Sequence, residues 1–352
     1  MTDLNHPWLQ FLAANGARLD DGQTGEVLGF DSINTDATDP AQGYAVPLTE
    51  LGLIEATGAD AAGFLHNQLT NDIEHLDAAH ARRAGYCTPK GRLLATFLVW
   101  RTADAIMLQL PRALQPAVQK RLQIFVLRAK ARLADAGADQ VAIGLGGKRA
   151  AEALAPWFAT PPDAPLAKID NEAGTLIRQP DAFGQPRWMW IAPLALAQQA
   201  WPALSASLAP SPAHVWRRAD IEAGVPQVVA QTQELFVPQM INFELVDGVS
   251  FKKGCYPGQE IVARSQYLGK QKRRMLPARV ASDSVAPGME LFASADPGQP
   301  CGMVVNAAPA PSGGAELLVE IKLAAREEGS VHLGAADGPA LEFLPLPYPL
   351  PQ

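Results

Sequence analysis

The chain has 352 residues, of which 48% are hydrophobic and 18% are charged, and its formal net charge is −7. These values are ordinary for a globular protein of two or three domains and argue against global disorder. The acidic balance also argues against a protein that coats nucleic acid through bulk charge, so a basic surface would have to be local.

Cysteine usage indicates a reducing compartment. The three cysteines, Cys87, Cys255 and Cys301, are odd in number and widely spaced, which does not fit a disulfide framework. None forms a C-x-x-C pair, so we expect no self-contained zinc or iron–sulfur site. Residues 1–15 lack the pattern of a signal peptide, and no stretch is apolar for long enough to span a membrane. We therefore expect a cytoplasmic protein.

The first predicted elements are a helix, a connection, a strand and a second helix. Apolar residues around Trp8 predict a short helix, and residues 20–42 read as a long polar connection. Residues 45–57 have a strand-like pattern. Asp60 is placed to cap a helix whose apolar stripe would be buried.

A turn between two strands follows. Residues 84–92 are rich in turn formers, and the run 93–100 is apolar nearly throughout, which predicts a strand buried on both faces. Residues 111–128 then fit a helix with Pro in its first turn. Its predicted buried face carries Leu114, Val118, Leu122 and Phe125.

Residues 138–211 read as a compact α+β unit with an antiparallel sheet. Strands are predicted at 140–147, 175–179 and 188–191, and helices at 149–158 and 194–208. The glycines at 144, 146 and 147 invite a nucleotide-binding interpretation, but the segment lacks the full fingerprint and an acidic partner. We therefore do not favour that interpretation.

The segment 252–260 combines tight-turn residues with side chains that can do chemistry. Pro257 and Gly258 suit the two central positions of a type II turn, because Gly accepts the positive φ of the second position. Glu260 and Arg264 are four residues apart, so a short helix after the turn would pair them.

Cys255 lies within this segment. It follows Lys252 and Lys253, and nearby ammonium charge favours the thiolate over the thiol. A reactive cysteine is one interpretation. The other is a buried cysteine in a Gly/Pro loop with solvated lysines.

The sign of the charge reverses locally around this segment. Residues 252–274 contain seven basic residues and one acidic residue, Glu260, although the whole chain is acidic. The basic residues are Lys252, Lys253, Arg264, Lys270, Lys272, Arg273 and Arg274. Such a patch could receive a phosphate backbone or an acidic partner, or it could be a solvated loop.

The last part of the chain has the pattern of a small barrel. Six short strand-like runs are separated by turn residues, at 276–280, 289–292, 301–306, 317–321, 331–333 and 341–344. Cys301 within them is most simply a small buried residue. The proline-rich tail 345–352 should be extended.

Several of these segments resemble one family. Residues 253–260 match the signature K-G-C-Y-x-G-Q-E of the YgfZ family, which is related to the glycine cleavage T-protein, an aminomethyltransferase. Residues 58–72 resemble a second shared signature, and Trp216 with the Ile-Glu-Ala-Gly stretch at 221–224 resembles a third. Pro238 and Gln239 also match a pair found in relatives, so the resemblance covers most of the chain.

The resemblance implies an α+β fold like that of the T-protein, a ring of three domains made of two α/β units and a C-terminal β-barrel. The first, folate-binding domain would be discontinuous and comprise residues 1–137 and 212–270. Residues 138–211 would form a ferredoxin-like α+β domain, and residues 271–352 the barrel.

The resemblance also implies a function. Family members bind tetrahydrofolate and are linked to the assembly or repair of iron–sulfur clusters in client enzymes, including enzymes that modify tRNA. Cys255 would be the functional thiol and Lys253 its electrostatic neighbour. Trp216 would stack on the flat pterin while Glu222 accepts hydrogen bonds from it, unless the two are simply a core ring and a solvated carboxylate. The remaining implied folate-site residues are Tyr256, Gln259, Glu260 and Arg264.

Two departures from related patterns leave alternatives open. The carboxylates of true aminomethyltransferases correspond to Leu94 and Ala95, neither of which can move a proton. Leu51 stands where relatives carry a tryptophan. The alternatives are a folate-dependent aminomethyltransferase or demethylase, and a non-catalytic scaffold that uses residues 252–274 to hold tRNA or an acidic protein. The patch could also receive a folate polyglutamate tail.

Overall fold

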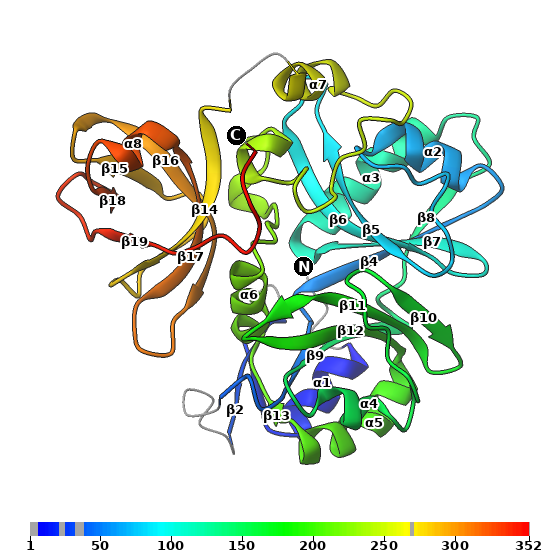
Figure 1. Ribbon diagram of the computed structural model, residues 1–352. Helices are drawn as coiled ribbons and strands as arrows, with labels where there is room; N and C mark the ends of the chain where they lie inside the picture. Colours follow the sequence, from blue (N-terminus) through cyan, green and yellow to red (C-terminus); the bar gives the residue numbers. More distant parts are fainter. Residues whose placement is uncertain (1–5, 21–24, 32–38, 268–270, 352) are drawn as a thin grey trace. The chain divides into compact units, whose positions relative to one another are not determined.

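The structure is a computed structural model, and it describes residues 6–20, 25–31, 39–267 and 271–351 (Figure 1). It has mixed helices and strands, as predicted, and it divides into two compact units. Unit 1 comprises Met1–Phe64, Glu74–Arg82 and Phe97–Ala219, and unit 2 comprises Leu65–Ile73, Arg83–Thr96 and Asp220–Gln352. The finer partition into three domains stays a prediction.

A six-stranded sheet organises unit 1, with the strand order β10-β11-β12-β9-β3-β13. Its neighbours pair antiparallel, except that β13 runs parallel to β3. Its strands are β3 (Tyr44–Pro47), β9 (Gln140–Gly146), β10 (Lys168–Asn171), β11 (Gly174–Ala182), β12 (Gln185–Pro193) and β13 (Ala209–Pro210). The antiparallel sheet predicted for residues 138–211 is therefore present. It also takes in β3 from outside this range, and its strands β10 and β13 were not predicted.

Three helices cover one face of this sheet (Figure 1). They are α1 (Pro7–Ala14), α4 (Ala150–Leu154) and α5 (Leu194–Ser207). The predicted helix around Trp8 is thus confirmed, and its indole lies edge-on to Trp201 of α5 at a centroid distance of 6.0 Å. Apolar side chains from the sheet and the helices form one buried core, which stabilises the layer through the area that it removes from water.

Two glycines of β9 have a packing role. A Cβ atom at Gly144 would lie 2.4 Å from the ring of Trp216, and one at Gly146 would lie 2.4 Å from the ring of Tyr44. These positions therefore admit only glycine, because the aromatic rings rest directly on the backbone. This packing accounts for the glycine-rich segment without a bound nucleotide.

A second sheet has the order β5-β6-β7-β4-β8. Its strands are β4 (Leu51–Thr57), β5 (Ala81–Cys87), β6 (Leu93–Arg101), β7 (Ala105–Pro111) and β8 (Arg132–Asp135). The division between the two units passes through β5 and β6. All residues of β6 except Arg101 are buried, which confirms the predicted burial on both faces. The strand predicted over 45–57 is in fact two strands, β3 and β4.

Helices follow β4 and β7. The predicted helix after Asp60 is α2 (Ala61–Gln68), and the Asp60 carboxylate accepts a hydrogen bond from Lys130 N–H at 2.7 Å. The helix predicted over 111–128 consists of a 3₁₀ turn, η2 (Arg112–Leu114), and α3 (Gln115–Val126). The predicted burial of Phe125 is wrong, because its side chain is 47% exposed. Val126 takes the buried position instead, in the i, i+4 series from Val118 and Leu122.

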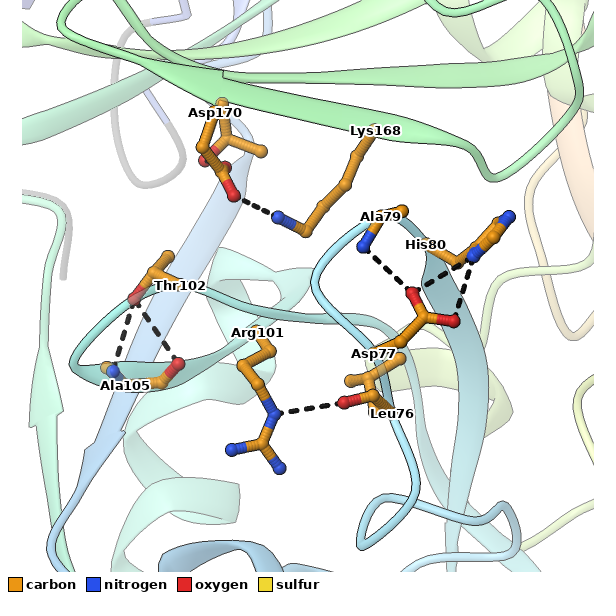
Figure 2. Close-up of polar contacts among 10 residues, drawn as sticks. Leu76, Asp77, Ala79, His80, Arg101, Thr102, Ala105, Lys168 and Asp170 are labelled. Atoms are coloured by element: carbon orange, nitrogen blue, oxygen red, sulfur yellow. Dashed lines mark hydrogen bonds and ion pairs between the residues drawn. The ribbon is translucent and has the colours of Figure 1, made fainter.

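Polar contacts hold the loop before β5 (Figure 2). Arg101 Nε donates to the carbonyl oxygen of Leu76 at 2.9 Å, and Asp77 bonds to the ring of His80 at 3.0 Å. The hydrogen bond from His80 is the main cause that lowers the pKa of Asp77. Nearby, the ammonium of Lys168 pairs with Asp170 (Figure 2). The loop is therefore held to β6 and within itself by polar contacts.

The C-terminal sheet in unit 2 has the order β18-β15-β16-β17-β14-β19. Its strands are β14 (Arg273–Val280), β15 (Glu290–Ala293), β16 (Asp296–Pro309), β17 (Ala315–Lys322), β18 (Val331–Leu333) and β19 (Leu341–Phe343), with α8 (Leu323–Glu327) after β17. A bridge between His332 and Ala340 joins its two ends, so the sheet is a nearly closed barrel. All six predicted strands are confirmed, and Cys301 is buried in the barrel core as predicted.

The polar connection near the N-terminus contains structure that was not predicted. Strands β1 (Ala17–Leu19) and β2 (Val27–Phe30) pair antiparallel. Phe30 is buried and stacks on Trp201 at 5.8 Å, so tertiary packing overrides the polar composition around it. The rest of this connection, residues 21–24 and 32–38, lies outside the described residues. Among the helices of the described part, none is long and apolar enough to cross a membrane.

Candidate functional site

The predicted type II turn is present at the start of α7 (Gln259–Tyr267). Gly258 has a φ of +83°, and Gln259 N–H donates to the carbonyl oxygen of Tyr256 at 3.2 Å. Pro257 and Gly258 thus occupy the central positions of a turn closed by an i to i+3 hydrogen bond. The turn ends the segment that carries Cys255.

The turn rests on the loop between β5 and β6. A Cβ atom at Gly258 would lie 2.4 Å from the carbonyl oxygen of Thr88 and 2.7 Å from Cα of Gly91. Gly91 itself has a φ of +70°. The two glycine turns therefore touch backbone to backbone, which fixes the segment 252–260 against residues 88–91.

Exposure distinguishes the three cysteines. Cys255 is exposed, whereas Cys87 and Cys301 are buried. Burial raises the pKa of the Cys87 thiol to about 12, and burial is also the main cause that raises the pKa of Cys301. Of the three thiols, only that of Cys255 is open to a solvent-borne partner.

Lys253 ties the Cys255 segment to the end of α2. Its ammonium donates to the carbonyl oxygens of His66 and Leu69, the second at 2.9 Å. A cation at a helix C-terminus also interacts favourably with the helix dipole. The same ammonium lies 4.8 Å from the ring centroid of Tyr256, whose pKa is raised mainly by burial. Lys253 is therefore an anchor for the loop as well as a neighbouring charge.

A histidine that is not among the predicted site residues lies beside this loop. His66 is 7% exposed, and its Nδ1 is 3.1 Å from Oδ1 of Asp72. Its other ring nitrogen, Nε2, lies 3.7 Å from the position that a Cβ atom would take at Gly254. Asp72 belongs to a family-like segment, but no spacing rule links His66 to a cysteine almost 190 residues later.

The other predicted residues of this segment are less organised. Glu260 and Arg264 are both exposed, and within the described part of the chain no ion pair joins them, so the predicted pair is wrong. Exposed i, i+4 pairs gain too little to fix two long side chains. Gln259 Nε2 reaches the carbonyl oxygen of Gly254 at 3.5 Å, at the limit of a hydrogen bond.

The predicted basic patch is smaller than its composition indicates. Arg273 pairs with Glu320 of β17 at 2.7 Å, and Arg274 pairs with Glu244. Both side chains of the second pair are about 5% exposed or less. Exposed basic side chains remain at Lys252, Arg264 and Lys272, while Lys270 lies outside the described residues.

The helix α6 (Ala213–Glu222) carries Trp216 and Glu222. Trp216 is 3% exposed and packs in a core cluster of unit 1, with the guanidinium of Arg187 4.6 Å from its ring centroid. Its ring is thus covered by Gly144 and Arg187, and no sequence motif marks the arginine. Glu222 is exposed in unit 2.

Two buried donors lie on β11 in unit 1. Arg178 and Gln179 are 4% and 5% exposed, and among the described residues Arg178 Nε and Gln179 Nε2 have no hydrogen-bond partner. Gln179 is the cross-strand partner of Arg187. Buried donors without a partner are costly, so such atoms fit a ligand that brings carbonyl or carboxylate oxygens, as a folate does.

Two buried apolar residues stand where the resemblance to aminomethyltransferases implies carboxylates. Leu94 and Ala95 are buried in β6, at 7% and 0% exposed. Gln233 Nε2 donates to the carbonyl oxygen of Leu94 at 2.7 Å, so this stretch is packed as core. No group of three or more His, Cys, Asp or Glu side chains that could hold a metal ion occurs within the described residues.

Comparison with known proteins gives consistent relatives. No protein-family model matches the chain. The chain is 32% identical over 243 residues to the tRNA-modifying protein YgfZ of Edwardsiella ictaluri. The matched residues cover 67% of this chain and 72% of that protein. It is 33% identical over 244 residues to YgfZ of Photorhabdus laumondii, with the same coverage. It is 29% identical to YgfZ of Klebsiella pneumoniae over 321 residues, or 88% of this chain and 96% of that protein.

A solved structure shares the fold. The glycine cleavage system aminomethyltransferase T from Bartonella henselae matches with a TM-score of 0.77 over 96% of both chains, at 17% sequence identity. The predicted T-protein-like architecture is therefore confirmed, including the barrel-like sheet at the C-terminus. At this identity the likeness concerns the fold and carries no activity with it.

Proposed function

Because the chain belongs to the YgfZ family, we propose that it binds a reduced folate and acts in the assembly or repair of iron–sulfur clusters. Its clients would include enzymes that modify tRNA, in keeping with the names of its relatives. The observation that carries the proposal is the exposed thiol of Cys255, held on a rigid turn. We place this activity in the cytoplasm.

Side chains of unit 1 offer donors to tetrahydrofolate, whereas Glu222 stays assigned to the folate site by resemblance. Glu222 is exposed and can accept hydrogen bonds from the amino and N–H groups of a pterin. In unit 1, Gln179 and Arg178 have buried donors for carbonyl or carboxylate oxygens, and the buried guanidinium of Arg187 lies over the ring of Trp216. Trp216 would then act chiefly by supporting Arg187. Tyr256, Gln259, Glu260 and Arg264 stay assigned to the folate site by resemblance.

The thiol of Cys255 would act on the cluster or on its sulfur, both of which are cargo. A thiolate is the form that binds iron and attacks sulfur, so exposure and a nearby cation are the features that the role requires. Lys253, anchored between α2 and the ring of Tyr256, is such a cation. Client proteins or tRNA would approach the exposed Lys252, Arg264 and Lys272.

Folate binding is tested by titration. We expect tetrahydrofolate to bind the purified protein in calorimetry, and Gln179→Leu to weaken binding about fivefold, since one charge-neutral hydrogen bond is worth about 1 kcal/mol. Gln199→Leu, on the exposed side of α5, is the matched control. Equal affinities for the two variants would remove Gln179 from the site, and no binding at all would overturn the folate proposal.

The thiol is tested in the host. Cys255→Ser should lower the activity of cluster-dependent tRNA-modifying enzymes while the purified variant keeps its thermal midpoint, because the side chain is exposed. Cys301→Ala, in the barrel core, should lower the thermal midpoint and leave the activity of the client enzymes unchanged. Normal client activities in the Cys255→Ser strain would contradict the proposed role.

Aminomethyl transfer is the second candidate, and the likeness to aminomethyltransferase T favours it. The buried, apolar Leu94 and Ala95 count against it, because nothing at these positions can accept a proton. An assay for formaldehyde transfer to tetrahydrofolate separates the two candidates. We expect no transfer above the uncatalysed rate.

A further inference from the structure

The C-terminal end of α3 exposes a cluster of apolar side chains. Three of the seven large hydrophobic residues that are exposed in the described part of the chain lie within four consecutive positions there. They are Ile124, Phe125 and Leu127, at 62%, 47% and 86% exposed. Single exposed hydrophobic residues are normal, but several together mark a surface that binds something. The cluster therefore indicates a docking surface in unit 1.

Exposed basic side chains surround this cluster. The stretch 105–134 contains no Asp or Glu, although the whole chain has a formal charge of −7. Its exposed basic residues are Lys120, Arg121, Arg128, Lys130 and Arg132. Among the described residues no ion pair engages any of these five side chains, in contrast to Arg273 and Arg274. These five residues and the three apolar ones are called the α3 surface below.

Helical spacing interleaves the two kinds of side chain. Val118, Leu122 and Val126 face the interior of unit 1. On the outer side, Ile124 follows Lys120 by four positions, and Phe125 follows Arg121 by four positions, so each pair lies together on the helix surface. Lys and Arg have long aliphatic stems, so their charged ends can stay in a polar layer while apolar neighbours go deeper.

Neighbouring carboxylates do not cancel the charge of the α3 surface. The acidic residues that adjoin the stretch, pair with it or accept a hydrogen bond from it are Asp104, Asp135, Glu55 and Asp60. Glu50 acts on Arg112, a further cation at the other end of α3, and so does Asp135. Even when all these groups are counted, the cations outnumber the carboxylates. The surface therefore attracts anionic groups.

Leu127 has an unusual backbone conformation. It ends α3 with a φ of +48°, in the region where glycine is the usual residue because a Cβ atom is disfavoured there. The chain has a leucine instead, and its side chain is 86% exposed. Neither backbone conformation nor burial accounts for this residue type. A strained residue that folding does not require indicates a function for its side chain.

We propose that the α3 surface docks the protein onto a lipid bilayer with anionic headgroups. Its cations bind the headgroups, and Leu127, Ile124 and Phe125 enter the boundary between headgroups and acyl chains. Clustered basic residues attract anionic lipids, and apolar side chains beside them bury in the bilayer interface. The protein then lies on the membrane without spanning it, and none of the described helices could span one.

Other occupants fit the α3 surface less well. A second copy of the same surface would place like charges opposite each other. Nucleic-acid bases stack on aromatic rings, but two of the three exposed apolar residues are aliphatic. An acidic protein would need a pocket matched to Leu127, whereas hydrocarbon accepts any apolar side chain. Exposed aliphatic side chains among unpaired cations therefore favour a lipid surface.

Sedimentation with vesicles tests the docking. The probe is large unilamellar vesicles of phosphatidylcholine with about 30% phosphatidylglycerol, and vesicles of phosphatidylcholine alone are the control. We expect the full chain to bind the anionic vesicles about tenfold more tightly than the neutral ones, and less tightly as added salt screens the charges. Absence of binding to the anionic vesicles at about 0.1 M salt would overturn the inference.

Leu127→Gly separates docking from folding. Glycine accepts the positive φ, so the thermal midpoint should not fall. The same change removes the most exposed apolar side chain of the surface, so binding to anionic vesicles should weaken about tenfold. Leu28→Gly, at a leucine that is 50% exposed on β2, is the matched control and should bind like the unmodified chain. Equal binding of the two variants would overturn the inference.

Arg128→Gln tests the charge. Binding to anionic vesicles should weaken about fivefold, because each basic residue near an anionic surface contributes to the attraction. Lys148→Gln, in the exposed turn after β9, is the matched control and should leave binding unchanged. Equal binding of these two variants would count against the proposed surface.

Nucleic acid is distinguished by a parallel titration with bulk tRNA. If the chain binds tRNA, and Arg128→Gln weakens that binding while Leu127→Gly changes neither tRNA nor vesicle binding, the surface belongs to nucleic acid and the inference is overturned. None of these measurements uses folate, Cys255 or client enzymes. Their outcome is therefore independent of the proposed function.

Discussion

Cys87 and Cys255 lie in the same unit and in contacting segments, yet they meet opposite environments. Cys87 ends β5, where neighbouring strands bury it, and burial raises the pKa of its thiol to about 12. Cys255 is exposed in a loop that two glycine turns and one lysine hold in place. The same atom type is therefore inert in one position and available in the other.

The difference shows how a thiol can be both fixed and accessible. A strand fixes a side chain by surrounding it, which also removes it from solvent. The loop before α7 instead fixes its backbone through contacts at Gly258 and Lys253, so that the side chain between them needs no cover. Four predictions test this contrast.

The largest effect is expected in thiol reactivity. With a pKa of about 12, Cys87 has a thiolate fraction at neutral pH about three orders of magnitude below that of an ordinary thiol. Cys255 should therefore be alkylated at least a thousandfold faster in the native protein, and the difference should vanish in urea. Peptide mass spectrometry of both sites over time measures the two rates. Comparable native rates would contradict the assigned burial of Cys87.

Gly258→Ala should be the most damaging change in the loop. The positive φ costs about 1–2 kcal/mol for a residue with a Cβ atom, and this Cβ would clash with Thr88 O at 2.4 Å. We expect a loss of about 2–4 kcal/mol in the free energy of unfolding, measured by urea titration. Gly254→Ala is the control: its Cβ would make only an ordinary contact at 3.7 Å, so a loss below about 1 kcal/mol is expected.

Alkaline pH should destabilise the protein through Cys87. Its folded pKa is raised, so the folded state holds the proton longer than the unfolded state does. The contribution to stability is complete below the ordinary thiol pKa and is lost as the pH rises toward about 12, by at most about 1.4 kcal/mol per pH unit. Urea midpoints at pH 8 and pH 10 should fall less for Cys87→Ala than for the unmodified chain. An equal fall would assign the effect to other groups, such as Tyr256.

Lys253→Met should give the smallest effect. The aliphatic stem is kept, while the helix end loses two charge-assisted hydrogen bonds, so we expect a loss of about 1–2 kcal/mol. The exposed Lys252→Met should be neutral within about 0.5 kcal/mol. If both variants have the same urea midpoint, the ammonium of Lys253 is not an anchor.

Local rules predicted much of this protein. The turn at Pro257 and Gly258, the six barrel strands and the burial of β6 each follow from features of a few consecutive residues. Rules of this kind failed where packing chooses between adjacent residues or pairs residues of distant segments. Phe125 was predicted to be buried, but the adjacent Val126 takes the buried position. Arg273 was counted as part of a basic patch, but it pairs with Glu320, which the sequence does not identify as its partner.

The amino-acid order alone determined the T-protein-like architecture and the segment that presents Cys255, because turn chemistry, hydrophobic period and a dense motif are local properties. Tertiary structure alone decided what surrounds these residues. It placed His66 beside Gly254, Arg187 over Trp216 and Gly91 beneath Gly258, contacts between residues about 29 to almost 190 positions apart. No short-range rule carries such pairings, since they arise only when the whole chain packs.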